Sequence, residues 1–113
     1  MDCVFCRVLQ NDINKQIIIK GNNVTAIKKP YTSKNVNFLI ITNSHIINLK
    51  DYTPERHKEI LSEIVEMANL LASKSKESRD WSMTINNGSK SNQTVFHLHA
   101  HISSNDSWSS WFY

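Results

Sequence analysis

The sequence contains no long apolar run. Its most apolar stretches, such as residues 38–41, span only a few residues, whereas a transmembrane helix needs about 20. The first residues include an acidic residue and lack the apolar core of a secretory signal. We therefore expect an intracellular, cytoplasmic protein that does not insert into a membrane.

Clustered positive charge is also missing. The formal net charge is +3, and the lysines are scattered apart from the Lys28-Lys29 pair. A face that binds nucleic acid usually shows clustered arginines and lysines. Nucleic acid is therefore not expected as the main partner.

Cysteine is limited to two residues, Cys3 and Cys6. A structural disulfide is not expected in a reducing compartment. A Cys-x-x-Cys pair there is a metal site, a redox pair or a coincidence. Only two residues precede Cys3, so the strand that should come before a thioredoxin-like redox pair is absent.

The apolar pattern predicts one α+β domain of 113 residues. Helical spacing appears over residues 4–11, and again from the helix start at Thr53-Pro54-Glu55 to about residue 75. β-Branched runs, alternation and turn signals predict strands over residues 16–20, 24–28, 36–42, 81–86 and 95–103. This order predicts an antiparallel five-stranded sheet with a short and a long helix on one face.

Three of the five histidines stand in one row within residues 94–103. On a strand, His97, His99 and His101 would share one face, and the apolar residues from Phe96 to Ile102 would share the other. Neighbours in such a row lie roughly 6–7 Å apart, which suits one phosphate or one metal ion. Histidine acts as a nucleophile, an acid–base catalyst or a metal ligand near neutral pH.

The loop before this row, residues 86–94, is rich in amide and hydroxyl side chains. Such a loop can direct backbone N–H groups and hydroxyls at an anion. Together with the histidines it suggests phosphoryl or nucleotidyl chemistry. An ordinary hairpin loop is an equally good interpretation of the loop taken alone.

Residues 93–103 resemble the signature of the histidine triad family, in which three histidines alternate with apolar residues. Further matches are Cys-Val-Phe-Cys at residues 3–6, the run at residues 38–41, His45-Ile-Ile-Asn-Leu49 and Asn86-Asn-Gly88. The resemblance covers about residues 1–103 and is closest to the nucleotide-binding, HinT-like branch. We therefore predict a histidine triad domain over residues 1–104 and a divergent tail over residues 105–113.

The resemblance implies a homodimer, with the sheet extended by dimerisation, that hydrolyses purine nucleoside phosphoramidates or adenylates. His99 would attack the α-phosphorus and form a covalent nucleotidyl-histidine, His101 would stabilise charge on the phosphate, and Thr94 would touch the phosphate or leaving group. Other positions implied for catalysis or nucleotide binding are His97, Asn86, Gly88, Gln93 and Lys29. An apolar base pocket would comprise Val4, Phe5, Val8, Ile27 and Leu39, for which plain core packing is the alternative.

The same resemblance implies a structural zinc site at Cys3, Cys6, His45 and His97. Two thiolates and two imidazoles suit a tetrahedral zinc ion. Several members of the family lack the cysteines, so the metal is not required for the chemistry. The alternative is two buried thiols beside a hydrogen-bonding histidine.

Two positions depart from the family pattern. Lys29 stands where the family has an acidic residue that binds both ribose hydroxyls, and lysine cannot accept a hydrogen bond from a diol. Asn92 stands where the family has glycine. A substrate with extra negative charge near the sugar, a lower nucleotide affinity or a one-residue misalignment would explain Lys29. The alternative functions are a dinucleoside polyphosphate hydrolase and a zinc-stabilised nucleotide-binding adaptor with vestigial activity.

Overall fold

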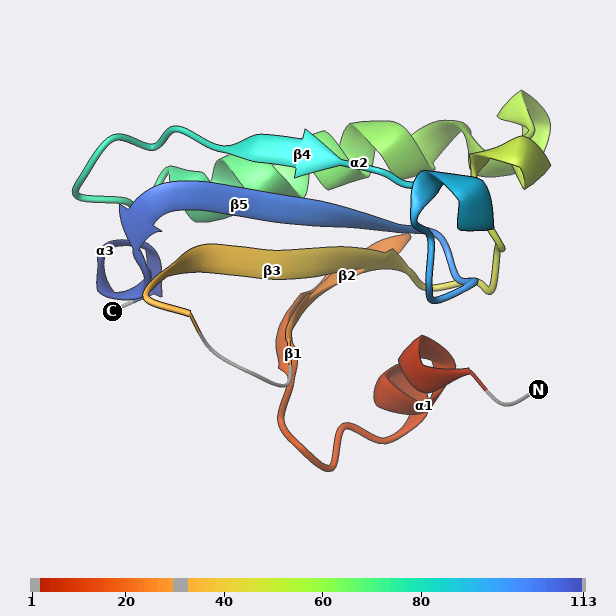
Figure 1. Cartoon of the computed structure of the whole chain (residues 1–113), viewed down its shortest axis with the longest axis horizontal. Helices are drawn as coiled ribbons and strands as arrows, with labels where there is room; N and C mark the ends of the chain where they lie inside the picture. Colours follow the sequence, from red (N-terminus) through yellow and green to blue (C-terminus); the bar gives the residue numbers. More distant parts are fainter. Residues whose placement is uncertain (1–2, 30–32, 113) are drawn as a thin grey trace.

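Five antiparallel strands form a single sheet in the order β1-β2-β3-β5-β4 (Figure 1). The computed structural model describes residues 3–29 and 33–112. The strands are β1 (Ile17–Lys20), β2 (Val24–Lys28), β3 (Asn35–Thr42), β4 (Ser82–Thr84) and β5 (His99–Ser107). The predicted antiparallel five-stranded sheet is confirmed, and the α+β class with it.

The helices are α1 (Val4–Gln10), α2 (Pro54–Ala72) and α3 (Trp108–Phe112), with short 3-10 turns η1 (Leu49–Asp51) and η2 (Ser89–Ser91). Pro54 occupies the first position of α2, as predicted, because its fixed φ suits a helix start and its missing N–H is not needed there. Within the described residues, no helix is both long enough and apolar enough to cross a membrane.

The two faces of the sheet are covered by different helices. The large core on one face joins α2 to alternate residues of β2, β3 and β5, such as Ala26, Ile40 and Ala100. The smaller core on the other face joins α1 to Ile27 and Leu39. The prediction that the helices lie on one face is therefore wrong. The apolar stripe of α1 was recognised correctly, but its spacing does not determine which face of the sheet it covers.

Strand β5 begins later and ends later than predicted. Residues 95–98 are not part of the strand, because Leu98 N–H donates to Ile46 O at 2.6 Å and Leu98 O accepts from Thr42 N–H at 3.2 Å. At its other end the strand continues to Ser107 and leads directly into α3. Residues 105–112 are thus part of the fold, with Trp111 only 1% exposed and packed against Phe38.

Candidate active site and metal centre

The three row histidines come together where β5 begins. His99 and His101 lie in β5, paired with Ile41 and Leu39 of β3, and their ring centroids are 4.9 Å apart. His97 precedes the strand and is buried. The prediction that all three share one strand face is therefore wrong for His97. Phe96, predicted on the opposite apolar face, is 48% exposed because it too lies before the strand.

The His99 ring is held in one tautomer by the main chain. Its Nδ1 lies 2.6 Å from the carbonyl oxygen of His97. A carbonyl can only accept, so Nδ1 carries the proton and donates it. In the neutral ring the other nitrogen, Nε2, then keeps its lone pair. A buried imidazole with a fixed, unprotonated Nε2 has the form required of a nucleophile or a general base.

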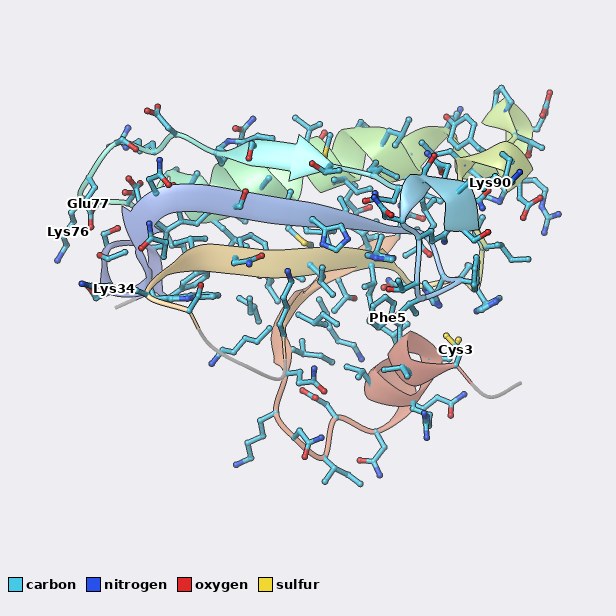
Figure 2. The ribbon with its side chains drawn as sticks, viewed as in Figure 1. Cys3, Phe5, Lys34, Lys76, Glu77 and Lys90 are labelled. Carbon is cyan, nitrogen blue, oxygen red and sulfur yellow. The ribbon has the colours of Figure 1, made fainter. Side chains whose placement is uncertain are left out.

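Helix α1 packs against this row through Phe5 (Figure 2). The Phe5 ring meets the rings of His97 and His99 edge to face, with centroids 5.7 and 5.0 Å apart. Edge-to-face packing of this kind restricts ring rotation. Phe5 therefore helps to fix the orientation of His99.

The surroundings keep the row neutral. Burial lowers the pKa of His99, and the positive charge of Lys29 lowers it further, against the opposing effect of the bond to His97 O. Burial, then His99 and Lys29, likewise lowers the pKa of His101. A neutral imidazole is the reactive form at physiological pH. The Lys29 side chain is thus close enough to act electrostatically on both histidines.

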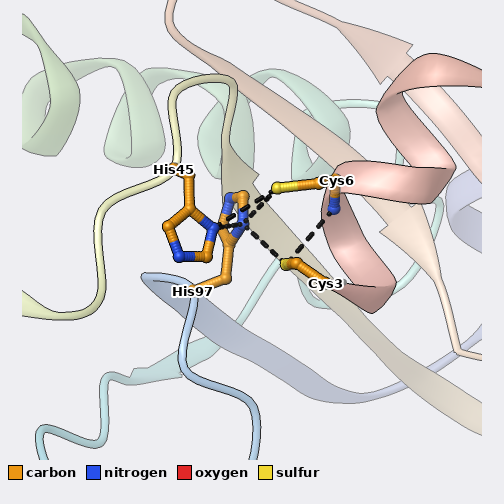
Figure 3. Close-up of side chains that lie close together, drawn as sticks. All are labelled: Cys3, Cys6, His45 and His97. Atoms are coloured by element: carbon orange, nitrogen blue, oxygen red, sulfur yellow. Dashed lines mark hydrogen bonds between the residues drawn. The ribbon is translucent and has the colours of Figure 1, made fainter. Parts of the chain in front are cut away.

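A second cluster lies at the start of α1, where Cys3, Cys6, His45 and His97 point toward one another (Figure 3). Their donor atoms all lie within 4.8 Å of one another. Cys3 Sγ and Cys6 Sγ lie 3.3 and 3.6 Å from His97 Nδ1. His45 Nδ1 lies 3.3 Å from Cys6 Sγ and 3.2 Å from His97 Nδ1.

These distances fit a single tetrahedral metal ion. Donor atoms held roughly 2.0–2.3 Å from zinc lie roughly 3.3–3.8 Å from one another. His97 Nε2 donates to Thr42 O at 2.7 Å, so its Nδ1 presents a lone pair to the cluster. Burial also lowers the pKa of His97 and keeps it neutral. The four residues could therefore hold a metal ion, as the sequence predicts.

His97 connects the two sites. Its ring faces the cysteines, while its carbonyl oxygen fixes His99. An ion at the cluster would join α1, the segment after β3 and the start of β5. It would therefore restrain the backbone that orients His99.

The buried side chain of Gln93 holds the loop of residues 86–94 together through hydrogen bonds. Its amide Nε2 donates to Ile47 O and Val95 O, and its Oε1 accepts from Asn48 Nδ2 and Gly88 N–H. All the hydrogen-bonding capacity of this buried side chain is thus used inside the protein. Gln93 shapes the loop, and the predicted contact between its side chain and a nucleotide would require these bonds to break.

The backbone of this loop adopts two left-handed conformations. Gly88 has φ 98° and Asn92 has φ 69°. Asparagine tolerates the latter region better than most residues do. Asn86 Nδ2 donates to Ser91 O across the loop, whereas Thr94 is exposed beside Gln93.

Four of the five residues predicted as a base pocket lie together. Phe5, Val8, Ile27 and Leu39 form the small core beneath α1, and each is at most 7% exposed. Val4 lies apart from them and is 51% exposed. The arrangement agrees with the core-packing alternative, and it places an apolar surface directly beside the histidine row.

Sequence reasoning did not identify Asn48, which is 3% exposed and positions Gln93. The motif around His45 contains this residue, but an amide in a loop carries no signal of a buried partner 45 positions away. The function of Thr42 O as the acceptor for His97 was also not predictable, because a main-chain carbonyl has no sequence signature.

Comparisons with known proteins agree with this geometry. Residues 2–112 match the family described as "Scavenger mRNA decapping enzyme C-term binding". An uncharacterized HIT-like protein of Synechocystis sp. is 30% identical over 101 residues, covering 89% of this chain and 88% of that protein.

Solved structures show the same fold. A HIT family hydrolase from Clostridium thermocellum is 33% identical, with a TM-score of 0.78 and coverage of 89% of this chain and 88% of that chain. A zinc-bound histidine triad family protein from Mycobacterium smegmatis is 24% identical, with a TM-score of 0.76 and coverage of 100% and 81%. At that lower identity the likeness concerns the fold.

Proposed function

The chain belongs to the histidine triad (HIT) family of hydrolases, and from that premise we propose that it is a HinT-like nucleotide hydrolase or nucleotidyl transferase. Its substrates would be purine nucleoside phosphoramidates or adenylates, attacked at the α-phosphate. The observation that carries the proposal is the fixed tautomer of His99, whose Nδ1 donates to His97 O at 2.6 Å. The reaction needs a neutral imidazole with a free Nε2 next to a phosphate-binding loop.

In the first step, His99 Nε2 donates its lone pair to the α-phosphorus, and the bond from phosphorus to the leaving group breaks. The leaving group departs with the bonding electrons and takes up a proton. The ring now carries a positive charge, which the hydrogen bond from Nδ1 to His97 O stabilises. In the second step, water attacks the same phosphorus and releases a proton to the solvent. The phosphorus–nitrogen bond breaks, its electron pair returns to His99 Nε2, and the nucleoside monophosphate leaves.

The remaining groups assist this chemistry. His101, whose ring centroid is 4.9 Å from that of His99, would donate a hydrogen bond to a phosphate oxygen as negative charge builds there. Thr94 is exposed and free to reach the phosphate or the leaving group. The purine would lie against the rim of the small core beneath α1, where Ile17 and Val95 are only partly buried.

A structural zinc ion is proposed at Cys3, Cys6, His45 and His97, because two sulfurs and two imidazole nitrogens stand at tetrahedral spacing. The ion would cross-link α1 to the sheet and supply no reaction chemistry. Within the described residues, a Cys3–Cys6 disulfide is absent, since both cysteines are free.

We also propose a homodimer. Helix α2 uses Ile60, Ile64 and Leu71 to cover the sheet, yet it leaves Leu61, Val65 and Leu70 between 36% and 49% exposed. Strand β4 lies at the end of the sheet order, with one exposed edge that a second copy could pair with. Sedimentation at micromolar concentration should give twice the mass of one chain, and a monomer would contradict the proposal.

The function is tested by turnover of an adenosine 5′-phosphoramidate, an adenosine 5′-monophosphate ester of an aromatic alcohol and a dinucleoside polyphosphate. We expect release of AMP from the first two and an acid-labile nucleotidyl adduct on rapidly quenched protein. His99→Ala should lose both, with rates lower by about 10⁴-fold or more, whereas His57→Ala, the matched histidine outside the site, should retain both.

The other outcomes discriminate between the alternatives. Preferred turnover of the dinucleoside polyphosphate would favour the second enzyme class. Nucleotide binding with no turnover of any substrate would favour an adaptor. A His99→Ala variant that keeps its rate would disprove the assignment of the nucleophile.

A further inference from the structure

A cleft of about 680 Å³ lies at the end of the sheet, between the start of β1, the end of β2, the start of β3, and α3. We call it the lysine cleft, because Lys28, Lys29 and Lys34 all line it. Figure 2 shows Lys34 at this end of the sheet, close to α3. The volume of the lysine cleft is in the range of small-molecule binding sites.

Positive charge dominates the cleft, although the Glu77 carboxylate accepts from Ser107, one of the lining residues. None of the described residues that line it is acidic. Within the described part of the chain, Lys28 and Lys34 have no carboxylate partner. Nearby Glu77 is bonded to Ser107 N–H and Oγ. Three like charges around one concave surface create a positive potential that attracts an anion.

The hydroxyl groups of the cleft contribute less than the lysines. Ser33 Oγ already donates to Asn35 O, and Ser107 Oγ already donates to Glu77. The apolar wall, which includes Trp108 and Phe112, excludes water from one side. A lower local dielectric strengthens the attraction between a lysine and an anion.

Lys29 joins the cleft to the histidine row. It lines the cleft, and it follows β2, whose Ile27 pairs with Leu39 of β3, which in turn pairs with His101 of β5. Burial lowers the pKa of Lys29 itself, as expected for a cation that is drawn from water without a partner. The row histidines themselves do not line the cleft, and Lys29 is the residue that would link the two sites.

We propose that the lysine cleft binds a second phosphate, carried on the sugar of the nucleotide whose α-phosphate lies at His99. This inference rests on the proposed function and narrows its substrate class to nucleotides with a phosphate on the ribose. Lys29 follows the end of β2, two residues after Ile27. The row of histidines runs from His99 to His101 toward this end of the sheet, since His101 pairs with Leu39 and Leu39 pairs with Ile27. The sugar between purine and α-phosphate would therefore stand beside Lys29.

A second phosphate attached to the α-phosphate, as in ADP, would point away from the lysine cleft. The leaving group departs on the side of the phosphorus opposite His99, whereas a 2′- or 3′-phosphate extends from the ribose ring. Only the latter would extend past Lys29 into the cleft that Lys28 and Lys34 also line.

The experiment measures binding of AMP, ADP and adenosine 3′,5′-bisphosphate by calorimetry. At low salt we expect the bisphosphate to bind about tenfold or more tightly than AMP, since one such factor corresponds to about 1.4 kcal/mol. The double variant Lys28→Gln/Lys34→Gln should reduce this preference to about twofold or less while AMP affinity stays unchanged. The control Lys20→Gln/Lys58→Gln removes the same charge outside the cleft and should keep the preference.

Each other outcome overturns the inference in a recognisable way. AMP and bisphosphate bound equally would overturn it and leave the proposed function intact. ADP bound more tightly than the bisphosphate would place the second phosphate on the α-phosphate instead of the sugar. A preference that survives in the Lys28→Gln/Lys34→Gln variant would show that the cleft is not its source. No binding of any nucleotide, with no turnover, would overturn both the function and the inference.

Discussion

The two faces of the sheet differ in whether their side chains carry hydrogen-bonding groups that are left without a partner among the described residues. On the α2 face, β5 contributes Ala100 and Ile102, both fully buried. On the α1 face the same strand contributes His99 and His101. The first face is stabilised mainly by apolar burial. The second has a smaller core and carries imidazoles whose lone pairs accept from no donor among the described residues. The same strand thus contributes to the main core on one side and to the proposed chemistry on the other.

The largest expected effect on stability comes from the α2 face. Ile64 is fully buried there, and Ile64→Ala should reduce the free energy of unfolding by about 2–5 kcal/mol, through lost apolar burial and a residual cavity. Urea denaturation measures this loss. Turnover per folded molecule should be unchanged, and Glu66→Ala on the exposed side of α2 should change stability by less than about 0.5 kcal/mol. Lost activity in folded Ile64→Ala protein would show that the two faces are coupled.

A substitution on the α1 face should have the opposite effect, lowering turnover without lowering stability. His101→Ala removes one donor to the proposed transition state, so the rate should fall by about 10²–10³-fold, or about 2.7–4 kcal/mol of activation free energy. The melting temperature should stay close to that of the wild type, because His101 has no hydrogen bond within the described residues that its loss would break. Turnover and thermal unfolding measured on one preparation separate the two effects. A rate within a factor of three of the wild type would contradict the proposed role.

Zinc tests whether the α1 face also contributes to stability. Protein purified without chelator should contain close to one zinc per chain, and removal of the metal should lower the free energy of unfolding. At a free zinc concentration a hundredfold above its dissociation constant, the loss is about 2.7 kcal/mol. Metal analysis and thermal unfolding with and without chelator measure both quantities. Cys6→Ser should reduce the zinc content and abolish the effect of the chelator, whereas zinc retained in that variant would place the ion elsewhere.

The sequence predicted most of the sheet because local pattern determines it. The predicted strand at residues 24–28 coincides with β2, and those at residues 16–20 and 36–42 differ from β1 and β3 by one residue each. The predicted strand at residues 95–103 failed at both ends. Alternation continues through His97, but the backbone of the next residue, Leu98, bonds to Thr42 and Ile46, and no local pattern reveals partners more than 50 residues away.

The same limit applies to the candidate site. Spacing within residues 3–6 and 97–101 indicated which residue types could bind a metal or a phosphate, and the metal cluster does assemble from the four predicted positions. Of the residues that line the lysine cleft, only Lys29 was predicted as a binding residue. Lys34 lines the cleft because β2, β3 and α3 meet there, and the sequence does not reveal that arrangement. Helix α3 was also missed, although Trp108, Trp111 and Phe112 follow helical spacing.

The smallest expected effect on stability comes from a change at Asp106. This residue refines the contrast between the faces, because it is a buried polar group on the α2 side. Its carboxylate accepts from Ser75 Oγ, from the N–H and Oγ of Ser78, from Arg79 N–H and from Trp111 Nε1. Burial alone would raise the pKa of Asp106, but these hydrogen bonds outweigh it and hold the pKa well below its usual range. All of its lone pairs are used, so it fixes α3 to the core and is not available for chemistry.

A depressed pKa in the folded state means that Asp106 stabilises the protein above the unfolded pKa of about 3.9 and loses this contribution as the pH falls below it. The melting temperature of the wild type should therefore fall between about pH 5 and pH 3. Asp106→Asn should melt lower at pH 7 and show a shallower fall over that range, because one acid-sensitive group is gone. Turnover at pH 7 should be unaffected in the folded variant. If the melting temperatures of the two proteins fall equally steeply with pH, the hydrogen bonds at Asp106 do not favour its charged form. In that case this buried polar group on the α2 face stabilises the fold no more than the histidines on the opposite face do.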